Sequence, residues 1–202
     1  MAIRDMNMCC QCLRYKRCRR KRRTAAKNIR EIIKNRIFID RRETVINERL
    51  RFGDFEGDTL GVPKSTHQTL AAVIERKSRY ILAEKILRLK NAMEGFKKIF
   101  RSLPARSLTL DNGTENTRYQ ELGIPTYFCH PYSSWEKGSI ENAFKLIREY
   151  IPKKKSLENY TDSDISAIID TINSRPRKCL NWKTPKEVFY ASFLNSERCT
   201  SG

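Results

Sequence analysis

The stretch Gly53-Asp54-Phe55-Glu56-Gly57-Asp58-Thr59 alternates acidic residues with apolar or small ones. This two-residue period predicts a β-strand over 52–60, with Asp54, Glu56 and Asp58 on one face. Like charges placed so closely repel one another, so the row must be solvated, paired with Lys or Arg, or gathered around a cation. On this stretch alone, a salt-bridged surface strand and a metal site are equally consistent with the sequence.

The rest of the chain predicts four further strands and three helices. The segments 68–75 and 79–86 are rich in β-branched and apolar residues and are joined by a hairpin-sized link, and 107–110 and 125–129 are short strands. Helical spacing of apolar residues predicts helices over 91–103, 140–151 and 164–172. This order predicts an α/β domain with a central five-stranded mixed sheet and helices on both faces.

The chain of 202 residues has room for one ordinary domain with tails. Lys and Arg dominate the segment 14–23, and such a block repels itself until it meets phosphates. We therefore expect 1–50 to form a basic arm and linker that is partly disordered. The segment 51–190 is then the folded core, and 191–202 is a C-terminal tail.

The charge balance favours a nucleic-acid partner. The chain carries 41 Lys and Arg against 23 Asp and Glu, a formal net charge of +18. An excess of this size indicates a polyanion, most commonly DNA or RNA, more than a surface that is basic only for solubility. No apolar run approaches the ~20 residues needed to cross a bilayer, and the N-terminus lacks the apolar stretch of a signal peptide. We expect neither a membrane protein nor a secreted one.

Two further acids stand where metal ligands are commonly presented. Asp111 ends the predicted strand 107–110 before the turn signal Asn112-Gly113, and Glu141 lies near the start of a predicted helix. Taken singly, Asp111 fits an Asx turn, and Glu141 fits a surface pair with Lys145 four residues on. Together with the acidic strand, they predict carboxylates from two strands and one helix that hold two divalent ions for phosphodiester chemistry.

Five blocks of the sequence carry a further signal. They are Arg51-Phe-Gly-Asp-Phe-Glu-Gly-Asp-Thr59, Glu75-Arg-Lys-Ser-Arg-Tyr80, Asp111-Asn-Gly-Thr-Glu115, Tyr127-Phe-Cys-His-Pro-Tyr-Ser-Ser-Trp135 running to Gly138-Ser-Ile-Glu-Asn142, and Asn173-Ser-Arg-Pro-Arg-Lys-Cys-Leu-Asn-Trp-Lys-Thr-Pro-Lys-Glu-Val-Phe189. In this order, and over roughly 33–189, the chain resembles the catalytic part of an IS30-family transposase. That family consists of DDE enzymes with the ribonuclease-H-like fold that retroviral integrases share.

The resemblance implies a catalytic and metal-binding triad of Asp58, Asp111 and Glu141, with Asp54 and Glu56 in support. It implies two Mg²⁺ ions, or Mn²⁺ in their place, for water attack at transposon ends and for attack of the exposed 3′-hydroxyl on target DNA. It also implies double-stranded DNA as the partner, homo-oligomers on that DNA, and a place in the bacterial cytoplasm at the nucleoid. Family members carry a helix-turn-helix region upstream. We find no such motif in 1–32 and expect a truncated or N-terminally diverged copy.

Other polar residues are expected around this centre. Asn112 and Glu115 are predicted to shape the pocket around Asp111. The cations predicted to contact DNA are Lys145, Arg148, Arg175, Arg177 and Lys178 in the core, and Arg19, Arg20, Lys21, Arg22 and Arg23 in the arm. A solvated basic face is the alternative for each of these cations.

Two other functions are considered: the first remains open and the second is disfavoured. A catalytically inert, truncated remnant that only binds DNA non-specifically would keep the same acids. A ribonuclease-H-type nuclease acting on RNA in hybrids is disfavoured, because the similarity lies with the transposase blocks. Cys9-x-x-Cys12, near Cys10 and Cys18, has the spacing of a metal knuckle, but no second pair follows, so we expect ordinary tail thiols and not a zinc site.

Overall fold

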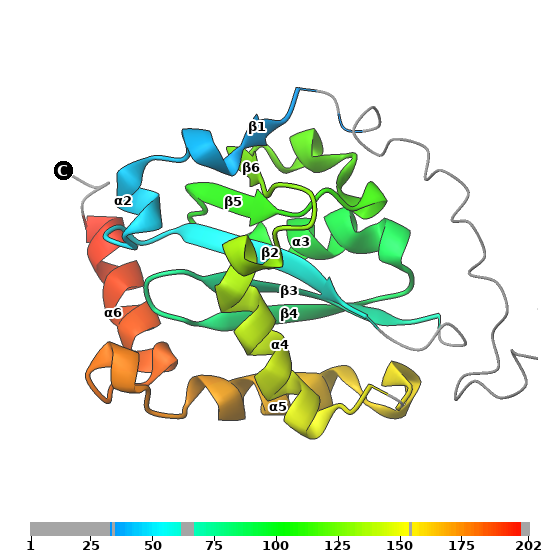
Figure 1. Cartoon of the computed structure of the whole chain (residues 1–202). Coiled ribbons are helices and arrows are strands. Elements are labelled where there is room, and N and C mark those ends of the chain that lie inside the picture. The colour runs from blue at the N-terminus through cyan, green and yellow to red at the C-terminus, as the bar shows by residue number, and fades with distance from the viewer. Residues whose placement is uncertain (1–32, 34, 62–66, 154, 199–202) are drawn as a thin grey trace, which may run out of the picture.

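The computed structural model describes residues 33, 35–61, 67–153 and 155–198, whose path is shown in Figure 1. One mixed sheet has the strand order β1-β6-β5-β2-β3-β4. Its strands are β1 (Ile37–Phe38), β2 (Asp54–Leu60), β3 (Thr69–Glu75), β4 (Ile81–Ile86), β5 (Ser107–Leu110) and β6 (Thr126–Phe128). The α-helices are α2 (Thr44–Asn47), α3 (Ala92–Phe100), α4 (Gly138–Tyr150), α5 (Asp162–Asn173) and α6 (Pro185–Arg198), with short 3-10 helices between them.

The described sheet has six strands and not the predicted five. The sixth strand, β1, pairs parallel with β6 and forms one edge of the sheet. A strand of two residues is too short to show a periodicity, so the sequence around it was predicted to be a linker. The other five strands and the helices α3, α4 and α5 occur in the predicted order, which confirms the α/β class and the mixed sheet.

The central strand β2 brings two distant acids to the same edge of the sheet. It runs antiparallel to β3 and parallel to β5, with Asp54 opposite Ser107 and Glu56 opposite Thr109. Continuing this register by two residues puts Asp58 level with Asp111, the residue directly after β5. Two acids 53 positions apart along the chain are therefore neighbours because β2 and β5 are adjacent parallel strands.

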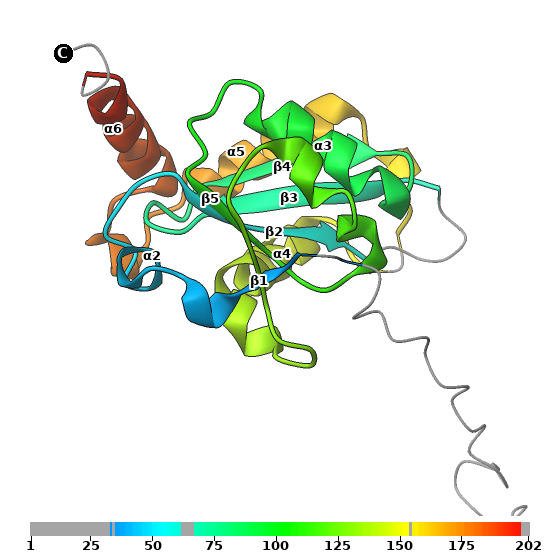
Figure 2. The same cartoon turned by 90° about the horizontal axis from the view of Figure 1, so that it is seen from above.

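Side chains of β2 and β3 alternate between two apolar cores. On one face Leu60, Leu70 and Ile74 pack with α4 and α5, and on the other Phe55 and Val73 pack with α3. In Figure 2 the strands lie between α3 and α4. Both faces of β3 are buried, which explains why its sequence is apolar without alternation from Leu70 to Ile74.

The predicted acidic row lies on the α4 face of β2. Strand alternation puts Asp54, Glu56 and Asp58 on the same side as Leu60, which packs with α4. The sequence-based prediction that these three acids share a face is confirmed. The acids are consequently directed toward the segment that leads into α4, and not toward α3.

The glycine at the centre of α3 allows that helix to approach the sheet closely. A Cβ atom at Gly95 would lie 2.8 Å from Ala71 Cβ and 2.8 Å from Ile86 Cγ2. Real Cβ atoms do not approach other carbons this closely, so a larger residue here would push α3 away from β3 and β4. Close approach, and not a backbone conformation, is the reason for this glycine.

Part of the predicted arm contacts the core, and part of the predicted tail is helical. Residues 1–32, with most of the arm, lie outside the described residues. Ile33 and Ile46 are buried, and Tyr119 Oη donates to the Asn35 carbonyl at 2.9 Å. The helix α6 continues through the predicted tail as far as Arg198. Figure 1 shows α6 at one end of the sheet.

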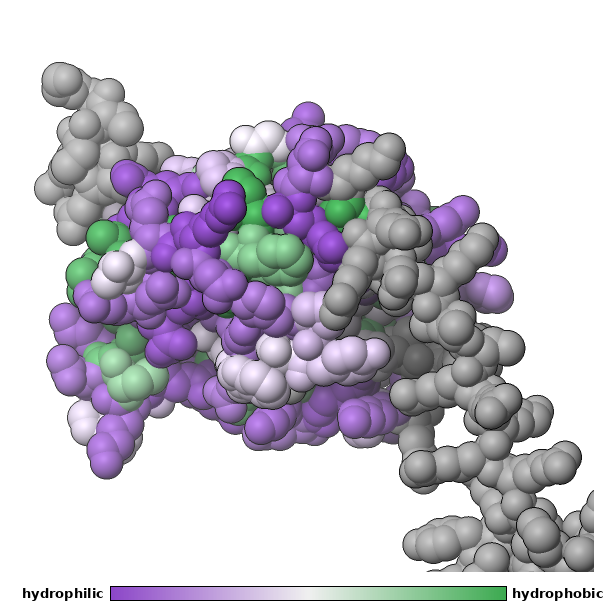
Figure 3. Space-filling model, turned by 45° about the horizontal axis from the view of Figure 1, so that its top comes forward, coloured by the Kyte–Doolittle hydropathy of each residue, from purple (hydrophilic) through white to green (hydrophobic). Residues whose placement is uncertain are grey.

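The surface is consistent with the high charge of the sequence. The face in Figure 3 is largely hydrophilic, and hydrophobic residues appear on it only as small separate groups. In the described part of the chain, no helix combines the length and the apolar character needed to span a membrane.

Candidate active site

The carboxylates of Asp58 and Asp111 share one ammonium group. Lys137 Nζ lies 2.8 Å from Asp58 Oδ2 and 3.6 Å from Asp111 Oδ2. Lys137 ends the 3-10 helix η6 (Ser134–Lys137) directly before α4, and its side chain is 6% exposed. The site therefore forms where two neighbouring strands meet the segment that leads into α4.

Burial and neighbouring charges together set the ionisation of this group. Burial acts to lower the pKa of Lys137, but the carboxylates of Asp58 and Asp111 outweigh it and raise that pKa above the ordinary value. Burial raises the pKa of Asp58; Lys137 opposes this rise and Asp111 adds to it. The ammonium is thus held in its charged form between two acids.

The loop after β5 orients Asp111. Asp111 Oδ1 accepts hydrogen bonds from the Gly113 backbone N–H at 3.2 Å and from Asn116 Nδ2 at 2.7 Å. This is the Asx-type turn that the sequence allowed. It uses one carboxylate oxygen and leaves the other facing Lys137, so the turn and a ligand role for Asp111 are compatible.

The two other predicted residues of this loop behave differently. Asn112 Oδ1 accepts from Arg36 at 2.7 Å, and its amide donates to the Cys129 carbonyl, so Asn112 ties the loop to the segment before β1 and to the end of β6. Burial raises the pKa of Glu115, and repulsion from Asp111 and Asp58 contributes to this rise. Glu115 therefore lies within electrostatic reach of the two aspartates.

Both carboxylate oxygens of Glu56 are bonded within the chain. It is 1% exposed, pairs with Arg76 Nη1 at 2.5 Å, and accepts the backbone N–H groups of Ser139 and Ile140 at 3.0 Å each. Those N–H groups lie in the first turn of α4, where a negative charge also stabilises the helix dipole. Glu56 thus fixes the start of α4 against β2.

Asp54 has a similar structural role at the start of β2. It is 1% exposed, pairs with Arg51 Nε at 2.9 Å, and accepts from Ser107 Oγ at 2.6 Å. Its bonds join β2 to β5 at the end of the strand away from Asp58. Asp54 and Glu56 therefore support the site by positioning its elements.

Glu141 lies on α4 but does not join the aspartates in this structure. It is half-buried, and within residues 35–61, 67–153 and 155–198 it has no ion pair, including with Lys145. In that same part of the chain, no three His, Cys, Asp or Glu side chains are arranged to hold a metal ion. Helical spacing places Glu141 on the flank of α4 that carries Arg148, which donates to the Gly61 carbonyl directly after β2.

The chemistry of the aspartate pair fits a hard divalent ion. Oxygen ligands from carboxylates are the ones that Mg²⁺ and Mn²⁺ prefer, and a positive charge already lies between Asp58 and Asp111. The ammonium of Lys137 is the stand-in for that ion in this structure. The assignment of Asp58, Asp111 and Glu141 as a triad remains a prediction.

The predicted DNA-contacting cations near α4 differ in their exposure and in their hydrogen bonds within the chain. Lys145 and Lys178 are exposed to solvent. Arg148 is half-buried and donates to the Gly61 and Ile151 carbonyls, and burial lowers its pKa. The two lysines are therefore free to meet a phosphate, whereas Arg148 also has a structural role.

Two more predicted cations lie after α5. Arg175 pairs with Glu149 at 3.0 Å and lies over the Tyr150 ring at 5.5 Å. Arg177 donates to the Ile172 carbonyl at 3.3 Å, and its Nε is buried without a partner. Arg19, Arg20, Lys21, Arg22 and Arg23 lie outside the described residues, so their role stays a prediction.

Sequence reasoning missed Lys137 and Arg76, the cations that pair with Asp58 and Glu56. Their signal was available in principle, because an acidic strand in a basic chain needs partners. Nothing in the local pattern selected these two residues among 41 Lys and Arg. Lys137 lies 79 residues and Arg76 lies 20 residues from its acidic partner, so only the fold identifies the pairs.

Comparison with known proteins gives relatives in sequence. The chain is 36% identical over 193 residues to the transposase for insertion sequence element IS1086 of Cupriavidus metallidurans, covering 91% of this chain and 57% of that protein. It is 39% identical over 162 residues to transposase InsI for insertion sequence element IS30C of Escherichia coli, covering 74% and 41%. The chain thus spans about half the length of the curated relatives it matches. No protein-family model matches it.

Comparison with solved structures gives the fold. The catalytic core domain of BIV integrase superposes with a TM-score of 0.54 at 19% identity, covering 74% of this chain and 99% of that core. The simian T-cell lymphotropic virus intasome structure gives 0.54 at 18% identity, covering 69% of this chain and 54% of that one. The predicted ribonuclease-H-like, integrase-like fold is confirmed, and at these identities the likeness concerns the fold alone.

Proposed function

This chain is a homologue of IS30-family transposases and has the fold of retroviral integrase cores, and from this premise we propose that it cuts and joins DNA during transposition. The reaction would consist of cleavage at transposon ends followed by transfer of the exposed 3′-hydroxyl into target DNA. The observation that carries the proposal is the convergence of Asp58 and Asp111 on one buried cation at the ends of adjacent parallel strands.

Asp58, Asp111 and Glu141 are the residues we propose to hold two Mg²⁺ or Mn²⁺ ions. When bound, such ions activate an attacking oxygen and stabilise a leaving oxygen on a phosphodiester. Asp111 is held for this task by Gly113 and Asn116, which fix one of its oxygens and leave the other free for a cation. Lys137 has a long flexible side chain, so its ammonium can leave the aspartates and turn to a DNA phosphate.

The remaining residues orient the site. Glu56 fixes the start of α4 through two backbone hydrogen bonds, and α4 carries Glu141 and the exposed Lys145. We propose that Lys145, Arg148, Arg175, Arg177 and Lys178 hold the DNA backbone near the acids, with the segment 19–23 adding phosphate contacts. Homo-oligomers on double-stranded DNA, at the nucleoid in the bacterial cytoplasm, complete the proposal.

The inert remnant is the second candidate. It is favoured by the absence of a three-acid metal group in the described residues. A remnant would bind DNA through its cations and give no cleavage or joined product with any divalent ion. The following experiment separates the two candidates.

The test is a strand-transfer assay on an oligonucleotide with an exposed 3′-hydroxyl, in Mg²⁺ or Mn²⁺. The wild type should give joined products, and Asp111→Asn should reduce them by about two orders of magnitude or more, because a lost metal ligand costs several kcal/mol of transition-state stabilisation. The Asn side chain keeps Oδ1 as an acceptor for Gly113, so DNA binding should persist.

Asp170→Asn is the matched control, since Asp170 is 57% exposed and pairs with Lys186 on the protein surface. It should leave transfer unchanged. Full activity in Asp111→Asn would remove Asp111 from the mechanism. A wild type that binds DNA but yields no product would establish the remnant.

A further inference from the structure

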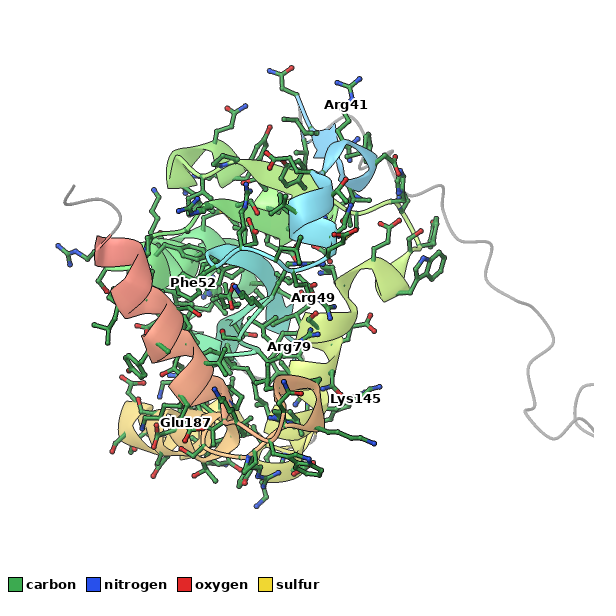
Figure 4. All side chains as sticks on the ribbon, turned by 90° about the vertical axis from the view of Figure 1, so that its left-hand side faces the viewer. Arg41, Arg49, Phe52, Arg79, Lys145 and Glu187 are labelled. Carbon is green, nitrogen blue, oxygen red and sulfur yellow. The ribbon has the colours of Figure 1, made fainter. Side chains whose placement is uncertain are left out.

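A cavity of about 250 Å³ lies on the flank of α4 away from Glu141 and Arg148. Arg49, Arg79 and Arg177 line it together with Ser139 and Asn142 of α4. The three arginines come from separate segments: one follows α2, one lies in the β3–β4 connection, and one follows α5. Figure 4 shows Arg49 and Arg79 close together beside α4. None of the proposed metal ligands lines this cavity.

Two of the three arginines converge on one hydroxyl. Arg49 Nη2 donates to Ser139 Oγ at 3.2 Å, and Arg79 Nη1 donates to the same oxygen at 3.0 Å. Burial lowers the pKa of Arg79, and repulsion from Arg49 contributes to this lowering. Burial likewise lowers the pKa of Arg177. Like charges are thus gathered around a neutral acceptor that cannot compensate them.

These charges lack an acidic partner. Among the residues that the structure describes, none of the three arginines has a carboxylate within ion-pair distance. The Nε groups of Arg49 and Arg177 are buried without any hydrogen-bond partner. The nearest buried acid, Glu56, is already bound to Arg76 and to the first turn of α4. The three arginines are half-buried, and two of them leave a buried Nε unsatisfied, so an external anion in the cavity would supply the charge and acceptors that the chain does not.

A phosphate group fits this set of donors best. Guanidinium groups match the oxygens of a phosphate with paired N–H donors, and three of them around one space suit a group with several anionic or polar oxygens. The cavity is smaller than the ~300–1,000 Å³ pockets of drug-sized ligands, which suits a phosphate with part of its sugar. Apolar residues at its floor, Ile74 and Ile81, can contact the sugar.

We propose that this cavity binds a backbone phosphate of DNA. The inference rests on the proposed function in taking DNA as the source of the phosphate. Lys137 and Ser139 are two residues apart, a chain length of at most about 7 Å, yet they serve opposite flanks of α4. A strand held in the cavity would therefore pass over the first turn of α4 toward Asp58 and Asp111.

The test is the salt dependence of binding to a duplex oligonucleotide without divalent ions. In Arg79→Gln and Arg177→Gln, affinity should fall about 3–10-fold, and the slope of log K against log salt should fall by about 1, because one phosphate contact is lost. Arg118→Gln is the matched control, with the same change of charge at an exposed arginine paired with Glu121. It should keep the wild-type slope. Unchanged slopes in folded cavity variants would overturn the proposal.

A second arm identifies the source of the phosphate. Inorganic phosphate, compared with chloride at equal ionic strength, should raise the thermal midpoint of the wild type, but by less than duplex DNA does. Both rises should be smaller in Arg79→Gln. A phosphate response that depends on Arg79, combined with an unchanged DNA slope, would make this a free-phosphate site and overturn the DNA assignment.

A third measurement needs no variant. Cys179 lines the cavity and is exposed, whereas Cys129 is buried. Saturating duplex DNA should slow alkylation of Cys179 severalfold, as followed by mass spectrometry of its peptide, and an unchanged rate would count against the site. All three measurements are free of metal and catalysis. A protein without strand-transfer activity can therefore still show the phosphate site, and a protein with strand-transfer activity can still lack it.

Discussion

The two flanks of α4 differ in whether carboxylates of the chain compensate their cations. On one flank Lys137 lies between Asp58 and Asp111, and its charge is compensated within the chain. On the other flank Arg49 and Arg79 donate to one serine hydroxyl, and Arg177 lines the same cavity. Among the described residues, none of these three arginines has a carboxylate within ion-pair distance. The first arrangement stabilises the free protein, whereas the second stabilises a complex. Charge compensation therefore separates residues that organise the fold from residues that await an external partner.

The largest effect should come from Glu56, which borders both flanks. Glu56→Ala leaves Arg76 buried without its acid and removes the acceptor for two N–H groups of α4, so it should lower the free energy of unfolding by about 3–5 kcal/mol. Urea denaturation measures this loss. Glu84→Ala is the control in the same sheet, because Glu84 pairs with Lys98 at the surface and should cost at most about 1 kcal/mol. Equal losses would mean that Glu56 does not anchor α4.

The compensated flank should depend on its cation. Lys137→Met leaves two carboxylates facing each other and should lower the free energy of unfolding by about 2 kcal/mol at pH 7. The pKa of Asp58 in the folded protein is already raised by burial and by Asp111, and without the opposing charge of Lys137 it rises further. The folded state then binds protons more readily, so the loss should shrink as the pH falls from 7 to 5.

Urea titrations of wild type and Lys137→Met at both pH values measure that trend. Lys97→Met is the control, since Lys97 pairs with Glu121 at the surface. A deficit that grows on acidification would show that the two carboxylates do not repel each other across the vacated position.

The uncompensated flank should respond in the opposite sense. Arg79→Gln removes a cation that has no acidic partner and is repelled by Arg49, so the unfolding free energy should stay the same or rise by up to about 1 kcal/mol. The same urea titration as for Lys137→Met measures it. A loss as large as that of Lys137→Met would erase the distinction between the flanks.

The smallest effect should come from His130, a second basic side chain held between two acids. Its Nδ1 lies 2.9 Å from Glu136 Oε1 and its Nε2 lies 2.8 Å from Asp40 Oδ2. The hydrogen bond with Glu136, followed by attraction from Asp40, raises the pKa of His130. The resulting stabilisation is complete below the ordinary pKa of about 6.5 and is lost as the pH rises through the higher folded value.

A thermal midpoint followed from pH 6 to pH 9 should therefore decline more in the wild type than in His130→Gln. The control is His67→Gln, at the other histidine of the chain, which should keep the wild-type decline of the thermal midpoint. Parallel curves for wild type and His130→Gln would exclude His130 as the source.

Much of the fold was predictable because it depends on local patterns. The alternation in 52–60, the hairpin of 68–75 and 79–86 and the apolar stripe of α4 each lie within one segment, and each was found in the structure. The strand β1 was not predictable, because its two residues are ordered by pairing with β6 far along the chain. Helix α6 was missed as well, and its anchor is an aromatic contact of Phe189 with Tyr80.

The candidate site was predictable in its acids and not in its cations. Asp58 and Asp111 were selected by strand ends and by family resemblance, and the register of β2 with β5 places them together. Lys137, Arg49 and Arg79 are ordinary members of a large basic population, and only the fold separates them from the rest. The position of Glu141 also depends on how α4 is seated, which no local pattern determines.

The connection between β3 and β4 differs from most hairpin links, which usually accept insertions. Within five residues it delivers Glu75 to the Gly53 and Ser78 N–H groups, Arg76 to Glu56, and Arg79 to Ser139. The bonds to Gly53, Glu56 and Ser139 reach three other parts of the fold, so lengthening the link by one residue would take several of them out of range at once. This link is consequently the wrong place to attach a tag or to open the chain for circular permutation, even though it lies at a strand turn.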